Sequence, residues 1–210
     1  MKNVYAISDL HLNPGDRFPD YSGLGGMLVV VGDLLNILPW GMNRWRIKEG
    51  YETCKSVADG LPEAHCVLMG NHEGRFSWLR ELLAESFGVS IARQLDIVPY
   101  HFEHGHKFTE WRILRHIADD AVEWLTSNSF TRKLWYDFCI RQGWMPSCYA
   151  NPGTKYEKMV GAYWALVLAQ AHKEHWNYVI GHSHTSCNIG PTEFGVQVID
   201  LGNNDLVRII

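Results

Sequence analysis

The sequence lacks the features of a disulfide-rich protein and of a membrane-spanning one. Its five cysteines are scattered singly with no CxxC pair, which argues against a zinc ribbon or a dithiol redox motif and favours reduced thiols. Apolar runs such as MLVVV and YWALVLA fall well below the roughly 20 residues that cross a bilayer. The first ten residues, MKNVYAISDL, hold too short an apolar run for a signal peptide. We therefore expect a cytoplasmic protein without a transmembrane segment.

The sequence also lacks an excess of positive charge. Lys and Arg number 19 against 23 Asp and Glu, which gives a net charge of −4 and no bulk electrostatic basis for dedicated nucleic-acid binding. Hydrophobic residues make up 46% of the 210 residues, enough to bury a core. The length fits one domain over residues 1–210.

Short apolar runs alternate with helix-like segments along most of the chain. Five such runs each end in a glycine or a polar cluster: 4–7, 27–31, 66–69, 97–102 and 178–180. Helical patterns lie between them at about 44–61 and 76–87. This alternation predicts an α/β fold with buried strands. Two further runs, 196–201 and 206–210, predict a terminal hairpin around 202–205.

Residues from about 107 to 175 differ from the rest of the chain. They contain no convincing strand, and five of the nine tryptophans fall within them. Apolar side chains recur at helical spacing on both sides of the loop-like stretch GWMPSCYANPG. We interpret this block as a helical cap inserted between the fourth and fifth strand ends. Its aromatic residues either pack between helices or line a substrate pocket.

The five strand-like runs are followed by polar clusters of Asp, Asn and His. They are Asp9-Leu10-His11, Gly32-Asp33, Gly70-Asn71-His72-Glu73, His104-Gly105-His106 and Gly181-His182-Ser183-His184. One cluster alone is weak evidence, because Gly, Asn and Asp form turns and a lone histidine is usually structural. Five clusters at five strand ends are stronger evidence, because open α/β sheets build their sites there. In an extended segment, side chains two apart point to the same side, so the last two histidines could face one point.

The residue types in these clusters suit a pair of divalent metal ions. Imidazole nitrogen with carboxylate and amide oxygen favours Mn, Fe, Zn or Ni over Mg or Ca alone. A carboxylate such as Asp33 can bridge two ions about 3.5–4 Å apart, an arrangement that suits displacement at phosphorus. The clusters therefore predict two divalent ions, with manganese the leading choice.

In the order DxH, GD, GNHE, HGH and GHSH, these motifs resemble those of the calcineurin-like metallophosphoesterase superfamily across residues 9–184. The resemblance implies a four-layer αββα sandwich with a dinuclear site at the strand ends. The first metal would be held by Asp9, His11, Asp33 and His184. The second would be held by bridging Asp33 together with Asn71, His104 and His182.

The resemblance also assigns roles around the metals. His72 would polarise a phosphate oxygen or protonate the leaving group. Arg75 would either clamp a phosphate or face solvent at a helix start. His106 would be either a ligand or a neighbour of the ligands. The implied reaction is hydrolysis of phosphomonoesters or phosphodiesters by a metal-bridging hydroxide.

Departures from the family pattern leave alternatives open. Many relatives read GDxxD where this chain has Asn36, which weakens the case for His72 as a strong acid. The arginine of the protein Ser/Thr phosphatase motif GDxxDRG is absent, so protein phosphatase ranks low. The insertion and ISDLHL are similar to the UDP-2,3-diacylglucosamine pyrophosphohydrolase branch, although that branch reads GNRD and HGD.

Two alternatives to a simple phosphoesterase therefore stand. The first is a pyrophosphohydrolase of a UDP-linked lipid or nucleotide, whose aromatic cap would hold acyl chains or stack a nucleobase. The second is a scaffold without catalysis, against which the intact set of seven expected ligands argues. The sequence does not predict an oligomeric state.

Overall fold

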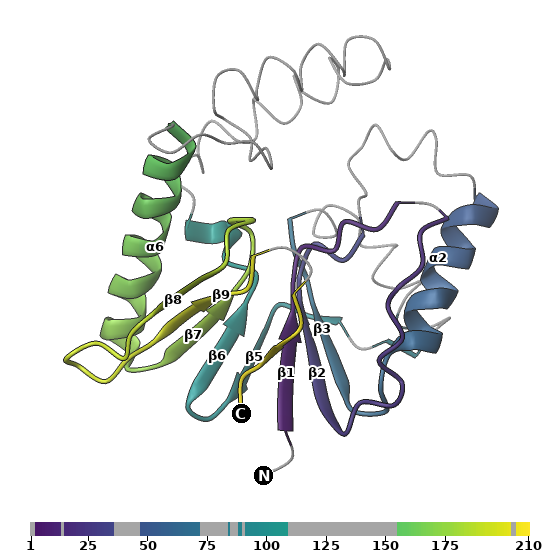
Figure 1. The fold of residues 1–210 in the computed structure, drawn as a ribbon, viewed down its shortest axis with the longest axis horizontal. Coiled ribbons are helices and arrows are strands. Elements are labelled where there is room, and N and C mark those ends of the chain that lie inside the picture. The colour runs from purple at the N-terminus through teal and green to yellow at the C-terminus, as the bar shows by residue number, and fades with distance from the viewer. Residues whose placement is uncertain are drawn as a thin grey trace.

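The computed structural model describes residues 3–13, 15–35, 47–71, 84, 88–89, 91–108, 155–202 and 205–210. Two five-stranded sheets lie face to face between two helices (Figure 1). The first sheet has the order β10 (Val207–Arg208), β1 (Asn3–Ile7), β2 (Gly26–Val31), β3 (His65–Leu68) and β4 (Ile91–Ala92). The second has the order β5 (Gln94–Ile97), β6 (Tyr100–Glu103), β7 (Asn177–Ile180), β9 (Val198–Asp200) and β8 (Cys187–Ile189).

Both faces of the first sheet are buried. In β2, Leu28 and Val30 pack toward the helix on the outer face, whereas Val29 and Val31 pack toward the second sheet. Successive side chains of a strand point to opposite faces, so a strand buried on both faces needs an uninterrupted apolar run. This requirement explains the run MLVVV.

Helix α2 (Ile47–Gly60) covers the outer face of the first sheet. Its Cys54 and Val57, one helical turn apart, are buried in the same cluster as Leu28 and Val30. The predicted helix at about 44–61 is confirmed over the described part, and the predicted helix at 76–87 lies almost wholly outside the described residues.

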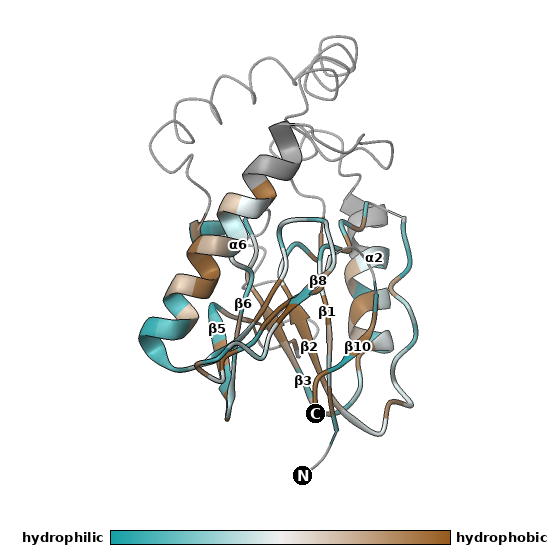
Figure 2. Cartoon of the chain, turned by 60° about the vertical axis from the view of Figure 1, so that its left-hand side comes forward, coloured by the Kyte–Doolittle hydropathy of each residue, from teal (hydrophilic) through white to brown (hydrophobic). Residues whose placement is uncertain are grey.

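Helix α6 (Lys155–Glu174) covers the outer face of the second sheet. Tyr163, Val167 and Ala171, spaced four apart, are buried in one cluster with residues of β7 and β9. Figure 2 shows hydrophobic residues along the central strands and on this helix. The sequence analysis assigned these residues to the cap, but they form the outer layer of the sandwich. The rest of the predicted cap, residues 109–154, lies outside the described residues.

The order of layers is helix, sheet, sheet, helix. The predicted α/β class is confirmed, and the two mixed sheets are consistent with the predicted αββα sandwich. None of the described helices is long and apolar enough to cross a membrane.

Two strand predictions are wrong. The run 97–102 is not one strand, because Val98 and Pro99 form the turn between the antiparallel strands β5 and β6. Proline has no N–H to give to a ladder, so it separates the two strands. The predicted terminal hairpin is also absent, since β9 pairs with β7 and β8 whereas β10 pairs with β1 in the other sheet. Leu201, Val207 and Ile209 all pack in the core between the sheets, which favours this crossing over a hairpin.

Candidate metal centre

The carboxyl ends of five strands bring the predicted ligands together. The strands β1, β2 and β3 run parallel in one sheet, and β6 and β7 run parallel in the other. The loops that follow them are joined by backbone hydrogen bonds. The amide of Asp9 donates to the carbonyl of Gly32 at 3.2 Å, and that of His11 donates to Asp33 at 2.9 Å. Within the first sheet, Ser8 Oγ also lies 2.8 Å from the carbonyl oxygen of Val31.

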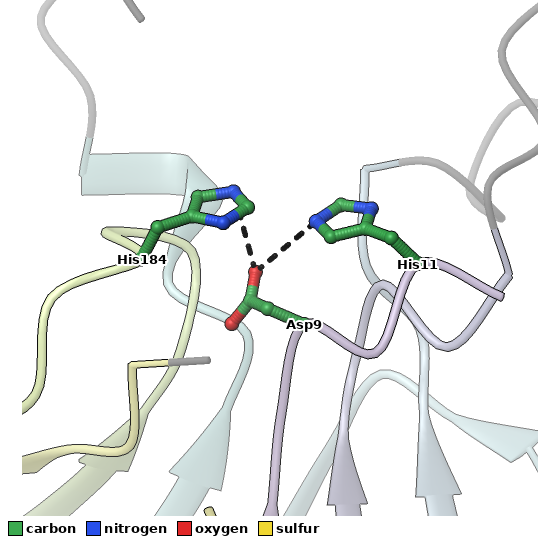
Figure 3. A group of neighbouring side chains, drawn as sticks. All are labelled: Asp9, His11 and His184. Carbon is green, nitrogen blue, oxygen red and sulfur yellow. Dashed lines mark ion pairs between the residues drawn. The ribbon is translucent and has the colours of Figure 1, made fainter. Parts of the chain in front are cut away.

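A first group consists of Asp9, His11 and His184, whose ligand atoms all lie within 4.8 Å of one another. Asp9 Oδ1 lies 3.9 Å from His11 Nε2 and 3.8 Å from His184 Nε2 (Figure 3). These separations are too long for hydrogen bonds. An ion with bonds of about 2.0–2.2 Å would contact atoms up to about 4 Å apart. The three side chains therefore converge on a point that one cation could occupy.

Hydrogen bonds hold one oxygen of the Asp9 carboxylate, and the other oxygen faces the two imidazoles. Its Oδ2 accepts hydrogen bonds from the Ser8 hydroxyl at 2.5 Å and from the amide of His182 at 2.9 Å. Its Oδ1 is buried and has no hydrogen-bond partner in the described part of the chain. A buried carboxylate oxygen in this state is unfavourable unless a proton or a cation satisfies it. The Asp9 carboxylate therefore fits a metal ligand.

A second group consists of Asp33, His104 and His182, again with ligand atoms within 4.8 Å. Asn71 lies beside it, because its Oδ1 is 3.1 Å from His104 Nε2, and Asp33 Oδ2 is 3.3 Å from the same nitrogen. The other ring nitrogen, Nδ1, lies 2.9 Å from the carbonyl oxygen of Val31. A proton on Nδ1 that donates to this carbonyl leaves the Nε2 lone pair facing two oxygens. A backbone carbonyl on the far nitrogen is how proteins commonly orient a metal-binding histidine.

The charges at this group favour a cation. Burial lowers the pKa of His104, but the charge and hydrogen bond of Asp33 and the charge of Asp9 more than offset it and raise the pKa to about 10. Without a metal ion the site thus stabilises a positive charge on this imidazole. A divalent cation would meet the same negative field and could take the place of the proton.

Five of the seven predicted ligands have a left-handed backbone. The φ angles are positive at Asp9 (55°), His11 (46°), Asp33 (47°), His182 (74°) and His184 (54°). Such conformations are uncommon outside glycine and cost on the order of 1–3 kcal/mol each. Strain of this kind clusters at functional sites, where the surrounding structure enforces it. The five strained residues therefore mark the same place as the two groups.

Glycines allow the loops to approach the ligands. A Cβ atom on Gly70 would lie 2.0 Å from Asp33 Oδ1, and one on Gly181 would lie 1.8 Å from the Ser8 hydroxyl and 2.6 Å from Asp9 Oδ2. Any side chain at these two positions would displace a carboxylate of the site.

The structure adds residues that the sequence analysis missed. Asp200, only 2% exposed, accepts a hydrogen bond from Trp164 Nε1 at 2.8 Å and another from Ser183, which lies between the two histidines of the GHSH motif. Burial raises the pKa of Asp200 to about 7, although the hydrogen bonds oppose the shift. The Tyr163 hydroxyl donates to the carbonyl of Gly181 at 2.9 Å. A carboxylate inside the apolar run 196–201 was the available signal for Asp200, whereas no sequence pattern indicates Tyr163.

The remaining predicted residues divide into two sets. His72 and Arg75 lie outside the described residues. His106 belongs to neither group of the described residues, and its ring centroid lies 5.6 Å from that of His104 and 6.4 Å from that of His182. His106 is therefore a neighbour of the second group. The bridging role of Asp33 stays a prediction.

No protein-family model matches the chain, and no curated protein matches it either. Among solved structures, the chain is similar to wild-type Vps29 from Entamoeba histolytica complexed with Zn²⁺, with 12% identity, 96% of this chain and 74% of that chain covered, and a TM-score of 0.40. A single mutant of the same Vps29 gives the same identity and coverage, with a TM-score of 0.38.

Proposed function

We propose that the protein is a dinuclear-metal phosphoesterase that hydrolyses phosphomonoesters or phosphodiesters. The observation that carries this proposal is the presence of two neighbouring groups of carboxylate and imidazole ligands at the ends of four strands. This mixed set suits Mn, Fe, Zn or Ni, and we take manganese as the leading candidate. Two bound divalent cations would lower the pKa of water and stabilise the charge that develops at phosphorus.

The residues of the chain would bind and orient the reactants. Asp9 and Asp33 supply negative charge for the cations, and the hydrogen bond from His104 to the carbonyl of Val31 fixes the orientation of that ring. Two divalent cations outweigh two carboxylates, so the loaded site keeps a net positive charge that favours an anionic ester. His72 and Arg75 follow Asn71 closely in the sequence and remain our candidates for contacts to the phosphate oxygens.

A matched pair of substitutions tests the proposal. His184 and His175 both have left-handed backbones, with φ of 54° and 58°, and asparagine adopts this conformation readily. We expect His184→Asn to lower kcat/KM for p-nitrophenyl phosphate and its bis ester by at least about 100-fold, because a ligand is lost. The control His175→Asn should retain activity, and circular dichroism should show both variants folded. Wild-type turnover by His184→Asn would contradict the proposal.

The same assay separates the alternatives. A scaffold that binds metals without catalysis would bind manganese and hydrolyse neither ester. A pyrophosphohydrolase would instead prefer a substrate with two linked phosphoryl groups.

A further inference from the structure

A cleft of about 310 Å³ opens beside the second group of ligands. Its lining includes His104 and Gly70 of the candidate metal centre and two basic residues, Arg93 and Lys107. No residue of the first group lines it. The phosphoryl group that is attacked has to reach both metals. The cleft is thus placed to hold a neighbouring part of the same substrate.

The basic residues of the cleft differ in how their charges are balanced. Lys107 Nζ lies 2.8 Å from Oε2 of Glu103, whose side chain is 8% exposed, so these two charges offset each other. The side chain of Arg93 makes no hydrogen bond or ion pair with any residue of the described ranges. It lies between β4 and β5, where the chain passes from the first sheet to the second. Among the described residues, no carboxylate therefore balances the guanidinium of Arg93, and its backbone position is fixed by strands on both sides.

The size and charge of the cleft indicate a small anion. Ligand pockets usually measure about 300–1,000 Å³, so this cleft lies at the lower limit and suits a compact group better than an acyl chain. The planar fork of an arginine matches two oxygens of a phosphoryl group. We propose that the cleft binds a second phosphoryl group of the substrate, next to the one attacked at the metal centre, and that Arg93 recognises it. This inference rests on the proposed function and names its substrate class.

A binding experiment tests the cleft without relying on turnover. We would measure the affinity of the manganese-loaded protein for methylenediphosphonate, which has two phosphoryl groups, and for methylphosphonate, which has one. If the contact is charge-assisted and bidentate, Arg93→Gln should weaken the affinity for methylenediphosphonate by about 10- to 100-fold more than the affinity for methylphosphonate. Arg93→Lys should recover part of the loss, because the charge remains but the fork does not. Lys173→Gln, on the last turn of α6, is the control and should change neither affinity.

Either of two results would overturn the inference. The first is an equal effect of Arg93→Gln on both phosphonates. The second is an equal loss for phosphonoacetate, in which a carboxylate replaces one phosphoryl group, because it would mean that the cleft binds any anion. A protein that hydrolyses no ester would refute the proposed function, and the binding comparison would still decide the role of the cleft.

A kinetic experiment distinguishes the two sources of a second phosphoryl group. Uridine diphosphate carries it through an anhydride, whereas a nucleoside 3′,5′-bisphosphate carries it as a separate ester. We would divide kcat/KM for each by the value for p-nitrophenyl phosphate and compare this ratio between wild type and Arg93→Gln. If the ratio falls more for the diphosphate, the second phosphoryl group of the substrate belongs to an anhydride. If it falls more for the bisphosphate, the second phosphoryl group belongs to a separate ester. A ratio that falls for neither contradicts the proposed role of Arg93.

Discussion

Gly70 offers the sharpest structural test of the second group of ligands. A Cβ atom at this position would lie 2.0 Å from Oδ1, 2.3 Å from the backbone nitrogen and 2.8 Å from Cγ of Asp33. Ordinary contact begins near 3.4 Å, so Gly70→Ala requires the carboxylate and its backbone to move by more than about 1 Å. Metal–ligand distances tolerate only about 0.2 Å. The substitution should therefore remove Asp33 as an effective ligand.

We expect Gly70→Ala to lower the affinity for manganese by at least about 10- to 100-fold, measured by titration calorimetry. Forcing a methyl group into this packed loop should also destabilise the metal-free protein by about 1–3 kcal/mol. The control is Gly161→Ala on α6, where a Cβ atom would meet nothing within 4 Å. This control should bind metal normally and gain about 0.5–1 kcal/mol in stability. Binding of two manganese ions by Gly70→Ala with wild-type affinity would mean that Asp33 does not hold a metal ion.

The remaining predictions concern protons. Because the pKa of His104 is about 10 in the metal-free protein, metal binding near pH 8 should release a proton from this ring, and calorimetry in buffers of different ionisation enthalpy should detect it. A binding enthalpy independent of the buffer would contradict this. The raised pKa of His104 also stabilises the folded, metal-free protein. This stabilisation is fully present below the ordinary pKa of 6.5 and is lost as the pH rises towards 10. The pKa of Asp200 is raised from 3.8 to about 7, so between these pH values the folded protein retains a proton that the unfolded chain has lost. The free energy of unfolding should therefore fall as the pH rises from 3.8 to about 7. In urea unfolding of the metal-free protein, Asp200→Asn should lose less stability over this pH range than the wild type. Parallel curves of unfolding free energy against pH for the variant and the wild type would contradict this role of Asp200.

The sequence predicted the parts of the fold that depend on local pattern. The runs at 4–7, 27–31, 66–69 and 178–180 correspond to β1, β2, β3 and β7 within one or two residues. Buried parallel strands require continuous apolar residues, so this signal is strong. The two-residue strand β4 and the three-residue strand β8 were not predicted, because elements so short carry no periodicity of their own.

The parts of the fold that depend on distant contacts were not predictable. The crossing of the chain end from β9 to β10 is decided by the core between the two sheets. The assignment of Tyr163 and Val167 to an outer layer likewise depends on β7 and β9, which follow later in the chain. A helical pattern shows that a face is apolar but does not show which surface covers it.

The candidate site followed from the sequence because its residues end five recognisable strands. The grouping of Asp9 with His184 depends on a separation of 175 positions that only the order of motifs could suggest. The left-handed backbone at His11 and the hydrogen bonds that hold Asp9 and His104 depend on tertiary contacts, and no local pattern predicts them. Arg93 was missed because it stands alone, without a motif around it.

In the proposed site, each of the two groups of side chains holds one metal ion. Anomalous diffraction from a crystal soaked in manganese would locate both ions. Two peaks are predicted, one among Asp9, His11 and His184 and the other among Asp33, Asn71, His104 and His182. The absence of an anomalous peak from both groups, in a crystal where these side chains are ordered, would mean that the protein has no dinuclear metal centre here.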